Sequence, residues 1–475
     1  MIVAMTKPLF AWDCLEDSPS LGTIKKFLAS VPDAKLLEGL RRQRGRGRND
    51  CPVHVAWGVL LLRMALRHTT IVSTLAELGR NEALRRLIGI ETEKDVPGPW
   101  NISRFEDVLG QEPHLSEVHK IFNSMVQELG LAVPDLGKDT AGDSTALHAR
   151  TKEAEKAKAE VAEGLPQPSG ARKEYKDAEG KVTKVFEWFG YKLHLLVDVK
   201  HEVVVAYEVT TANSADNQTI PDLVRQGKAN LPVGRIKTLA YDKAADDVGV
   251  HDLLYQAGIQ PVIQNRSLWK DQTEQMLPGH DGTSNIVYDE AGTVHCYDCT
   301  SQPIVRHPMS YIGHEPQRET LKYRCPARHE GWDCPHDAVC NAGKTYGKTV
   351  RVKQTIDLRR FPPIPRATKK FERLYNGRTA VERVNARLKI FWGADDGNIT
   401  GSRRFHALIA VVMIVHAGFA KLLAAAPRRE GTLGKTRLGP IQKALQPAAG
   451  KSAPAPTRSA RPAPIQKALQ PAAPS

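Results

Sequence analysis

The stretch Leu374–Lys389, LYNGRTAVERVNARLK, carries four polar side chains at the spacing Y-x2-R-x3-E-x6-K: Tyr375, Arg378, Glu382 and Lys389. In a continuous α-helix, with about 3.6 residues per turn, these positions fall within about 60° of one another. The spacing therefore predicts one helix with a single polar stripe. A carboxylate beside two cations and a phenol suits a metal ion bound next to phosphate groups. A solvated charged face is the alternative interpretation.

Two aspartates upstream are each expected where a strand ends. Asp143 lies in GKDTAGDSTALHAR, and Asp242 closes RIKTLAYD. Between them, the β-branched runs GYKLHLLVDV from Gly190 and VVVAYEVTT from Val203 predict a β-hairpin. A further strand, QPVIQNR, follows the second acid. The order acid, hairpin, acid, strand, helix with acid predicts an α/β fold with a ribonuclease-H-like core, whose carboxylates meet at one edge of a mixed sheet.

With these motifs the chain resembles the DDE transposases of bacterial insertion sequences, in the branch that carries the Y-R-E-K signature. The resemblance runs from about residue 51 to 421, with support from GYKLHLLVD, TTANSADNQTIPDLV and AYDKAADD. It implies that Asp143, Asp242 and Glu382 form the catalytic triad and hold two Mg²⁺ or Mn²⁺ ions. Asp139 is the competing candidate for the first acid.

The resemblance also implies an activity: metal-dependent cleavage at the ends of an insertion sequence, followed by transfer of the 3′-hydroxyl strand to target DNA. Arg378 and Lys389 would hold phosphates of the DNA end, Tyr375 would hydrogen-bond one, and the protein would act as a homodimer on double-stranded DNA. The family usually has a Gly and an aromatic residue after the second aspartate, where this chain has Ala244 and Ala245. Two rival functions remain, a silent DNA-binding protein derived from a transposase and a nuclease of the same fold.

The positive net charge of the chain indicates a polyanionic partner. The 475-residue chain has a formal net charge of +14 and a sequence pI near 9.4. Residues 427–475 hold nine cations against Glu430 alone, and they repeat PIQKALQPAA from Pro440 and Pro464. A second cluster, RRQRGRGR, places arginines between glycines that can follow a phosphate backbone, although solvated linker charge is the alternative for both. Its candidate DNA contacts are Arg41, Arg42, Arg44, Arg46 and Arg48.

Residues 52–131 predict a helical domain, and the resemblance implies that this domain helps to recognise the ends of the element. Apolar residues recur at helical spacing, Thr70 or Ser73 can cap a helix, and a further helix covers about 115–129. A domain that only packs on the catalytic core is the alternative. Further candidate contacts are Arg85 and Arg86.

Five cysteines fall between the second aspartate and the glutamate: Cys296, Cys299, Cys325, Cys334 and Cys340. The C-x2-C spacing of the first two is half of a zinc site, and nearby histidines offer competing ligands. The sequence therefore predicts a structural Zn²⁺ in a loop-rich insertion, with reduced cysteines as the alternative. Trp269 and Trp332 in the same insertion are candidates to stack on an unpaired base, but a core position is the favoured interpretation of each.

The predicted parts are a helical DNA-binding domain (1–135), the first part of the core (136–266), the insertion (267–353), the second part of the core with the catalytic helix (354–426), and a disordered basic tail (427–475). Residues 150–172 predict an exposed helix and loop. The start of the chain has too short an apolar patch for a signal peptide, and the run Ala407–Ala420 predicts a buried helix instead of a membrane span. A cytoplasmic protein in contact with the chromosome is expected.

Overall fold

The computed structural model describes residues 20–46, 51–150, 160–161, 163–177, 181–270, 273–278, 285–396 and 399–425. These residues all fall within one unit that ends at Ala426. The basic tail with its repeat, and Arg48, lie outside the described residues.

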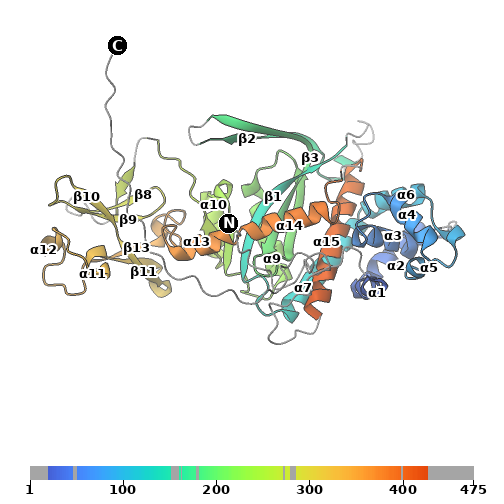
Figure 1. Ribbon diagram of the computed structural model, residues 1–475, viewed down its shortest axis with the longest axis horizontal. Coiled ribbons are helices and arrows are strands. Elements are labelled where there is room, and N and C mark those ends of the chain that lie inside the picture. The colour runs from blue at the N-terminus through green and yellow to red at the C-terminus, as the bar shows by residue number, and fades with distance from the viewer. Residues whose placement is uncertain are drawn as a thin grey trace, which may run out of the picture. The chain divides into compact units, whose positions relative to one another are not determined.

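A six-stranded mixed sheet is the scaffold of the unit (Figure 1). Its strands are β1 (Asp139–His148), β2 (Ser169–Lys176), β3 (Val182–Asp198), β4 (Val204–Thr211), β5 (Thr238–Tyr241) and β6 (Gln260–Ile263). Their order is β2-β3-β1-β5-β6, and β4 also pairs with β3. β1 runs antiparallel to β3 and parallel to β5, which is parallel to β6. The predicted hairpin is confirmed, because β3 and β4 pair in antiparallel register from Tyr191↔Thr211 to Val197↔Val204.

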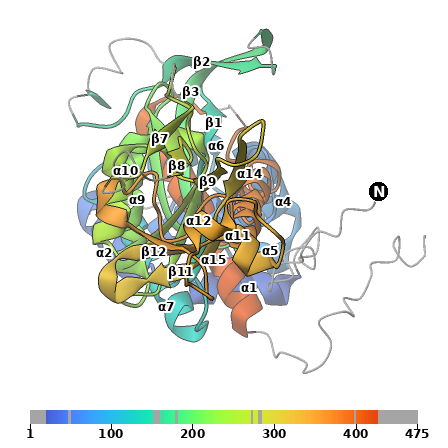
Figure 2. The same cartoon turned by 90° about the vertical axis from the view of Figure 1, so that its left-hand side faces the viewer.

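Two local predictions around β1 are wrong. Asp143 lies inside β1, because the hydroxylic residues after it continue the pairing with β3, as in Ser144↔His194. Residues 169–172 belong to strand β2 and not to an exposed helix and loop, while residues 151–159 lie outside the described part of the chain. β2 pairs with the N-terminal half of β3, and the two form a ribbon that extends beyond the rest of the sheet (Figures 1 and 2).

Helices cover both faces of the sheet because its strands are apolar on both sides. On one face, α9 (Asp216–Asn230) approaches β3 so closely that a Cβ on Gly227 would lie 2.7 Å from Leu196 Cδ2. On the other face, Tyr191 stacks on Phe405 of α15 (Ser402–Ala425) at 4.1 Å. The helix α14 (Thr379–Ile390) contacts β1 and β3, whereas α10 (Val248–Gln256) contacts β6.

The N-terminal helices pack around α15. They are α1 (Leu21–Ser30), α2 (Ala34–Arg44), α3 (Val53–Ala65), α4 (Ile71–Arg80), α5 (Glu82–Arg86), α6 (Pro99–Leu109) and α7 (His114–Ala132). Phe27 stacks on Phe419 at 5.3 Å, and Gly418 lets α1 approach. Among the described helices, α15 alone is long and apolar enough to cross a membrane, yet 78% of its apolar window is buried. The prediction of a buried helix over Ala407–Ala420 is confirmed.

Within these helices, Thr70 caps α4 and α7 covers the predicted segment 115–129. The arginine cluster differs from expectation, because Arg41, Arg42 and Arg44 form the last turn of α2. Buried leucines at positions 36 and 40 extend the helix into the cluster, and cations are favoured at a helix C-terminus.

Residues 267–353, the cysteine-bearing segment, lie between β6 and α13 (Lys369–Asn376) and are richer in strands than expected. One sheet contains β7 (Glu274–Met276), β8 (Ile286–Asp289), β9 (Val294–Asp298) and β10 (Val305–Pro308). The other contains β11 (Ser310–Glu315), β12 (Thr320–Arg324) and β13 (Thr349–Lys353). A separate apolar cluster, which includes Tyr288, Leu321 and Phe361, holds the sheets together. The expectation of a loop-rich insertion is therefore wrong for the two sheets.

Candidate active site

The four residues of the polar stripe lie on two helices. α13 ends at Asn376 and α14 begins at Thr379, so the prediction of one continuous helix is wrong. Glycine is a poor helix former, and the break falls at Gly377, where an added Cβ would lie 2.8 Å from Val199 Cγ1. Gly377 and Arg378 still have right-handed helical dihedrals.

Arg378 connects two of the predicted catalytic acids. Its Nη1 lies 3.3 Å from Asp143 Oδ2, and its Nη2 donates to Glu382 Oε1 at 2.9 Å. The third acid, Asp242, directly follows β5, and its Oδ1 accepts from the Ala244 N–H at 2.9 Å. Burial opposes the charge of Arg378, but Asp143, Tyr375, Glu382 and Asp242 together raise its pKa. The negative charges of all three acids therefore stabilise the same guanidinium group.

The register of β1 and β5 distinguishes Asp143 from Asp139. The two strands are parallel, with Asp139 beside Thr238 and Ala141 beside Ala240. Continuing this register places Asp143 level with Asp242, whereas Asp139 lies at the other end of the strand and accepts from Thr238 Oγ1 at 2.8 Å. Asp143 is thus the aspartate of β1 nearer to the second acid.

Asp143 is largely buried and incompletely paired. Burial raises its pKa to about 6, and the charges of Asp242 and Asp216 add to the effect. The Ser144 N–H, which donates to Oδ1 at 2.9 Å, and Arg378 oppose the shift. A carboxylate can accept about four hydrogen bonds, so Asp143 retains capacity for a ligand.

Tyr375 and Lys389 lie near the strand ends. The Tyr375 hydroxyl donates to Gln264 Oε1 at 2.9 Å, just beyond β6. The Lys389 ammonium donates to the Ala146 carbonyl of β1 and lies 3.2 Å from Asp395 Oδ2. Both side chains therefore lie along the edge where the acids meet.

The geometry agrees with a comparison to known proteins. The family model described as "Transposase DDE domain" matches residues 139–417, which is more than half of the chain. The match begins with β1 and ends within α15. The chain belongs to the transposase DDE domain family. Membership implies a transposase-type enzyme that acts on DNA and uses divalent metal ions. No curated protein matches the chain.

The sequence did not reveal the anchor of α14, the helix that carries Glu382. Glu202, in the turn between β3 and β4, is 1% exposed and accepts from Arg383 and, at 2.7 Å, from Arg387 Nη2. These arginines are four residues apart on α14 and follow Glu382 by one and five residues. The four-residue spacing of the two arginines is visible in VERVNARLK, but only the fold shows that Glu202 is their partner.

The sequence also did not reveal a buried carboxylate and its arginine partners, which hold the loop that follows Asp242. Asp246 is fully buried, and its carboxylate accepts from Arg359 Nε at 2.9 Å, Arg366 Nη2 at 3.1 Å and the Arg266 N–H at 2.7 Å. His251 Nε2 lies 3.1 Å from the same carboxylate. Burial opposes ionisation, but these donors lower the pKa of Asp246 to about 2. No local signal predicts this clamp, because the two guanidinium groups come from more than a hundred residues later.

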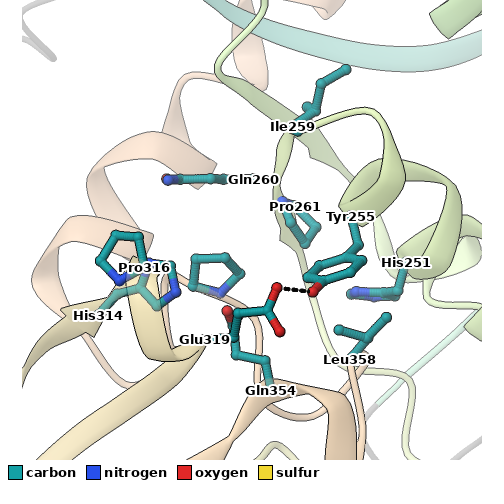
Figure 3. Close-up of a pocket in the computed structure, with 12 residues that line it drawn as sticks. His251, Tyr255, Ile259, Gln260, Pro261, His314, Pro316, Glu319, Gln354 and Leu358 are labelled. Atoms are coloured by element: carbon teal, nitrogen blue, oxygen red, sulfur yellow. Dashed lines mark hydrogen bonds between the residues drawn. The ribbon is translucent and has the colours of Figure 1, made fainter.

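A cavity of about 190 Å³ lies near this clamp, where α10 and β6 face the cysteine-bearing segment (Figure 3). It is lined by His251, Tyr255 and Gln260 from the core and by His314 and Glu319 from the segment. The Tyr255 hydroxyl donates to Glu319 across it. None of the three acids lines this cavity, so it is distinct from the candidate active site.

The remaining candidate residues lie elsewhere. Arg41, Arg42 and Arg44 are in the last turn of α2, Arg46 follows that helix, and Arg85 and Arg86 are in α5. Trp269 packs on the apolar cluster of the cysteine-bearing segment, as its core interpretation expects. Cys296, Cys325, Cys334 and Cys340 line one small cavity with Trp332, whereas Cys299 is exposed. Within the described ranges, no three His, Cys, Asp or Glu side chains already surround a common metal position.

Proposed function

We propose that the DDE domain cleaves DNA at the ends of an insertion sequence and transfers the freed 3′-hydroxyl strand to target DNA. The observation that carries the proposal is the convergence of Asp143, Asp242 and Glu382 on Arg378. The path β4-β3-β1-β5-β6 supports a ribonuclease-H-like core, because β4, β3 and β1 pair antiparallel and β1, β5 and β6 are mutually parallel.

The acids suit a hard divalent cation. Carboxylate oxygens are the ligands that Mg²⁺ and Mn²⁺ prefer, and Asp143, which has the Ser144 N–H at 2.9 Å and Arg378 at 3.3 Å, retains acceptor capacity for a cation. In this proposal Asp143, Asp242 and Glu382 would together hold the ions. Two such ions, when bound, activate the attacking oxygen and stabilise the leaving oxygen. The zinc ion that the sequence predicts has no part in this chemistry, because its candidate ligands all lie in the cysteine-bearing segment.

Arg378 would change partners when cations bind the acids. Its guanidinium now neutralises Asp143 and Glu382, and a cation at these carboxylates would repel it. Released from one or both acids, Arg378 can donate two parallel hydrogen bonds to a phosphate. Lys389 and Tyr375, which lie near the ends of neighbouring β-strands, would then contact the same DNA strand.

The N-terminal helices would recognise the ends of the element. Cations at the end of α2 and in α5 could contact phosphates, as could Arg48 and the basic tail outside the described residues. We further propose that the protein acts on DNA as a homodimer, in the cytoplasm at the chromosome.

Labelled element ends test the proposal. The purified full chain is incubated with Mg²⁺, a labelled end and unlabelled target DNA, and the products are separated by size. A cleaved 3′ end followed by a joined product supports a transposase. Cleavage without joining would indicate a nuclease, and end retention without cleavage would indicate a silent DNA-binding protein; either result would reject the proposal. Asp222→Asn, at an exposed ion pair on α9, is the matched control for substitutions of the acids.

A further inference from the structure

Four cysteines that are scattered along the cysteine-bearing segment converge at one place in the fold. Cys296 lies in β9, Cys325 follows β12, Cys334 lies in a loop, and Cys340 ends α12 (Asp337–Cys340). All four line one small cavity of about 20 Å³. Cys299, which completes the C-x2-C spacing with Cys296, is exposed and does not line the cavity. The structure therefore selects a different set of cysteines from the one the sequence spacing suggests.

Hydrogen-bond donors approach three of these sulfur atoms. Asn285 Nδ2 lies 3.4 Å from Cys340 Sγ, and Asn341 Nδ2 lies 3.5 Å from Cys325 Sγ. The backbone N–H of His336 donates to Cys334. N–H donors directed at sulfur stabilise thiolates, which are the form that binds metals.

A cation is also placed beside the cavity. The Lys348 ammonium donates to Asn285 Oδ1 at 3.2 Å, so the amide that contacts Cys340 is itself held in place. Four thiolates around one divalent ion carry a net charge of −2, and a nearby ammonium group reduces the cost of that charge.

The region around the cavity has few apolar side chains of its own. It contains α11 (Pro326–Glu330) and α12, which have five and four residues, and helices this short are not stable alone. The buried side chains of α11 are Pro326 and Ala327, and α12 buries none. This tip (residues 325–348) therefore needs a source of order other than apolar burial.

We infer that Cys296, Cys325, Cys334 and Cys340 bind one structural zinc ion as four thiolates, and that Cys299 is not a ligand. A closed set of four thiolates is the arrangement of structural zinc sites. A cavity of about 20 Å³ has room for one small atom. Because the side chains do not yet surround a common metal position, binding requires the thiols to turn towards the cavity centre. Zn²⁺ then displaces four thiol protons, and no oxidant or reductant takes part.

The test measures metal content and needs no DNA cleavage. The full chain is purified under reducing conditions, and zinc is measured by elemental analysis. We expect about one zinc per chain in the unchanged protein and in Cys299→Ser, which is the matched control. Cys334→Ser and Cys340→Ser should each retain less than half of that zinc, as expected when one of four ligands is lost. Zinc near zero in the unchanged protein, iron in its place, or loss of zinc only in Cys299→Ser would overturn the inference.

Cobalt substitution keeps the inference testable if a cysteine variant folds poorly. Zinc is removed from the unchanged full chain by a chelator and replaced by Co²⁺, and the visible spectrum is recorded. Tetrahedral thiolate coordination with intense sulfur-to-cobalt charge-transfer bands is expected, together with recovery of protease resistance at the tip. A spectrum of octahedral Co²⁺ without these bands would overturn the four-thiolate site. Asp143→Asn should bind the same amount of zinc, so failure of this inference is separable from failure of the proposed transposase chemistry.

Discussion

Asp143 is partly buried and Asp246 is fully buried, and these two carboxylates of the same DDE domain have different surroundings. Asp246 receives hydrogen bonds from two arginines, a histidine and a backbone N–H, which lower its pKa to about 2. Asp143 has one backbone donor and a more distant guanidinium group, and burial raises its pKa to about 6. The fold thus completes the bonding of Asp246 and leaves Asp143 able to bind a ligand from outside. Asp246 is therefore a structural carboxylate, whereas Asp143 is suited to a metal site.

Substitution of the proposed metal ligands should have the largest effect. Asp143→Asn, Asp242→Asn or Glu382→Gln should each reduce cleavage of a labelled element end by about a thousandfold or more, because groups that act as a unit in catalysis fail together. Binding of the same end should change little in a gel-shift assay. Asp139→Asn provides the comparison at the other end of β1. If Asp139→Asn abolishes cleavage and Asp143→Asn does not, the first acid is misassigned.

Removal of Asp246 should be the most destabilising of these changes. Asp246→Ala leaves Arg359 and Arg366 buried without their partner, which should cost about 3–5 kcal/mol in the free energy of unfolding. Denaturant titration of the metal-free protein measures this. Asp222→Ala, at an exposed ion pair, should change stability by less than about 0.5 kcal/mol. If Asp246→Ala and Asp222→Ala changed stability equally, Asp246 would not be the structural carboxylate that its contrast with Asp143 requires.

Asp143→Asn should have the opposite effect on the stability of the metal-free protein. A carboxyl group whose pKa is raised in the fold contributes stability that is complete below its unfolded pKa of 3.8 and is lost as pH rises through about 6. At about pH 7.5 the asparagine variant should therefore be more stable by about 1–3 kcal/mol. The difference should shrink as pH falls towards about 5. Thermal unfolding in a chelator across this range checks the sign, and a pH-independent difference would refute the assignment.

The smallest expected effect concerns the cations of the stripe. Arg378→Ala and Lys389→Ala should each weaken binding of the element end and reduce the slope of log K against log salt by about one unit. Arg225→Ala, at an exposed position on α9, is the control. An unchanged slope in both variants would mean that these side chains serve the fold and not the DNA.

The order of elements could be predicted because it depends on local patterns. The β-branched runs on either side of Lys200–Glu202 specify the hairpin, and the apolar residues before Asp242 specify β5. Family membership could also be recognised from the sequence. The end of β1 was mispredicted because pairing with β3 overrides the local preference of Asp143–Thr145. The break before α14 was mispredicted because the regular spacing of the polar stripe outweighed the poor helix propensity of Gly377.

The sequence by itself determined which residue types the chain can offer: acids in the right order, an arginine four residues before a glutamate, and clustered cysteines. Only the tertiary structure decided how they combine. It placed Asp143 rather than Asp139 level with Asp242, gave Glu202 and Asp246 their distant arginines, and separated Cys299 from the other thiols. The physical reason is that burial and hydrogen bonding depend on partners brought from far along the chain, and these partners determine whether a charged group serves the fold or remains free to bind a ligand.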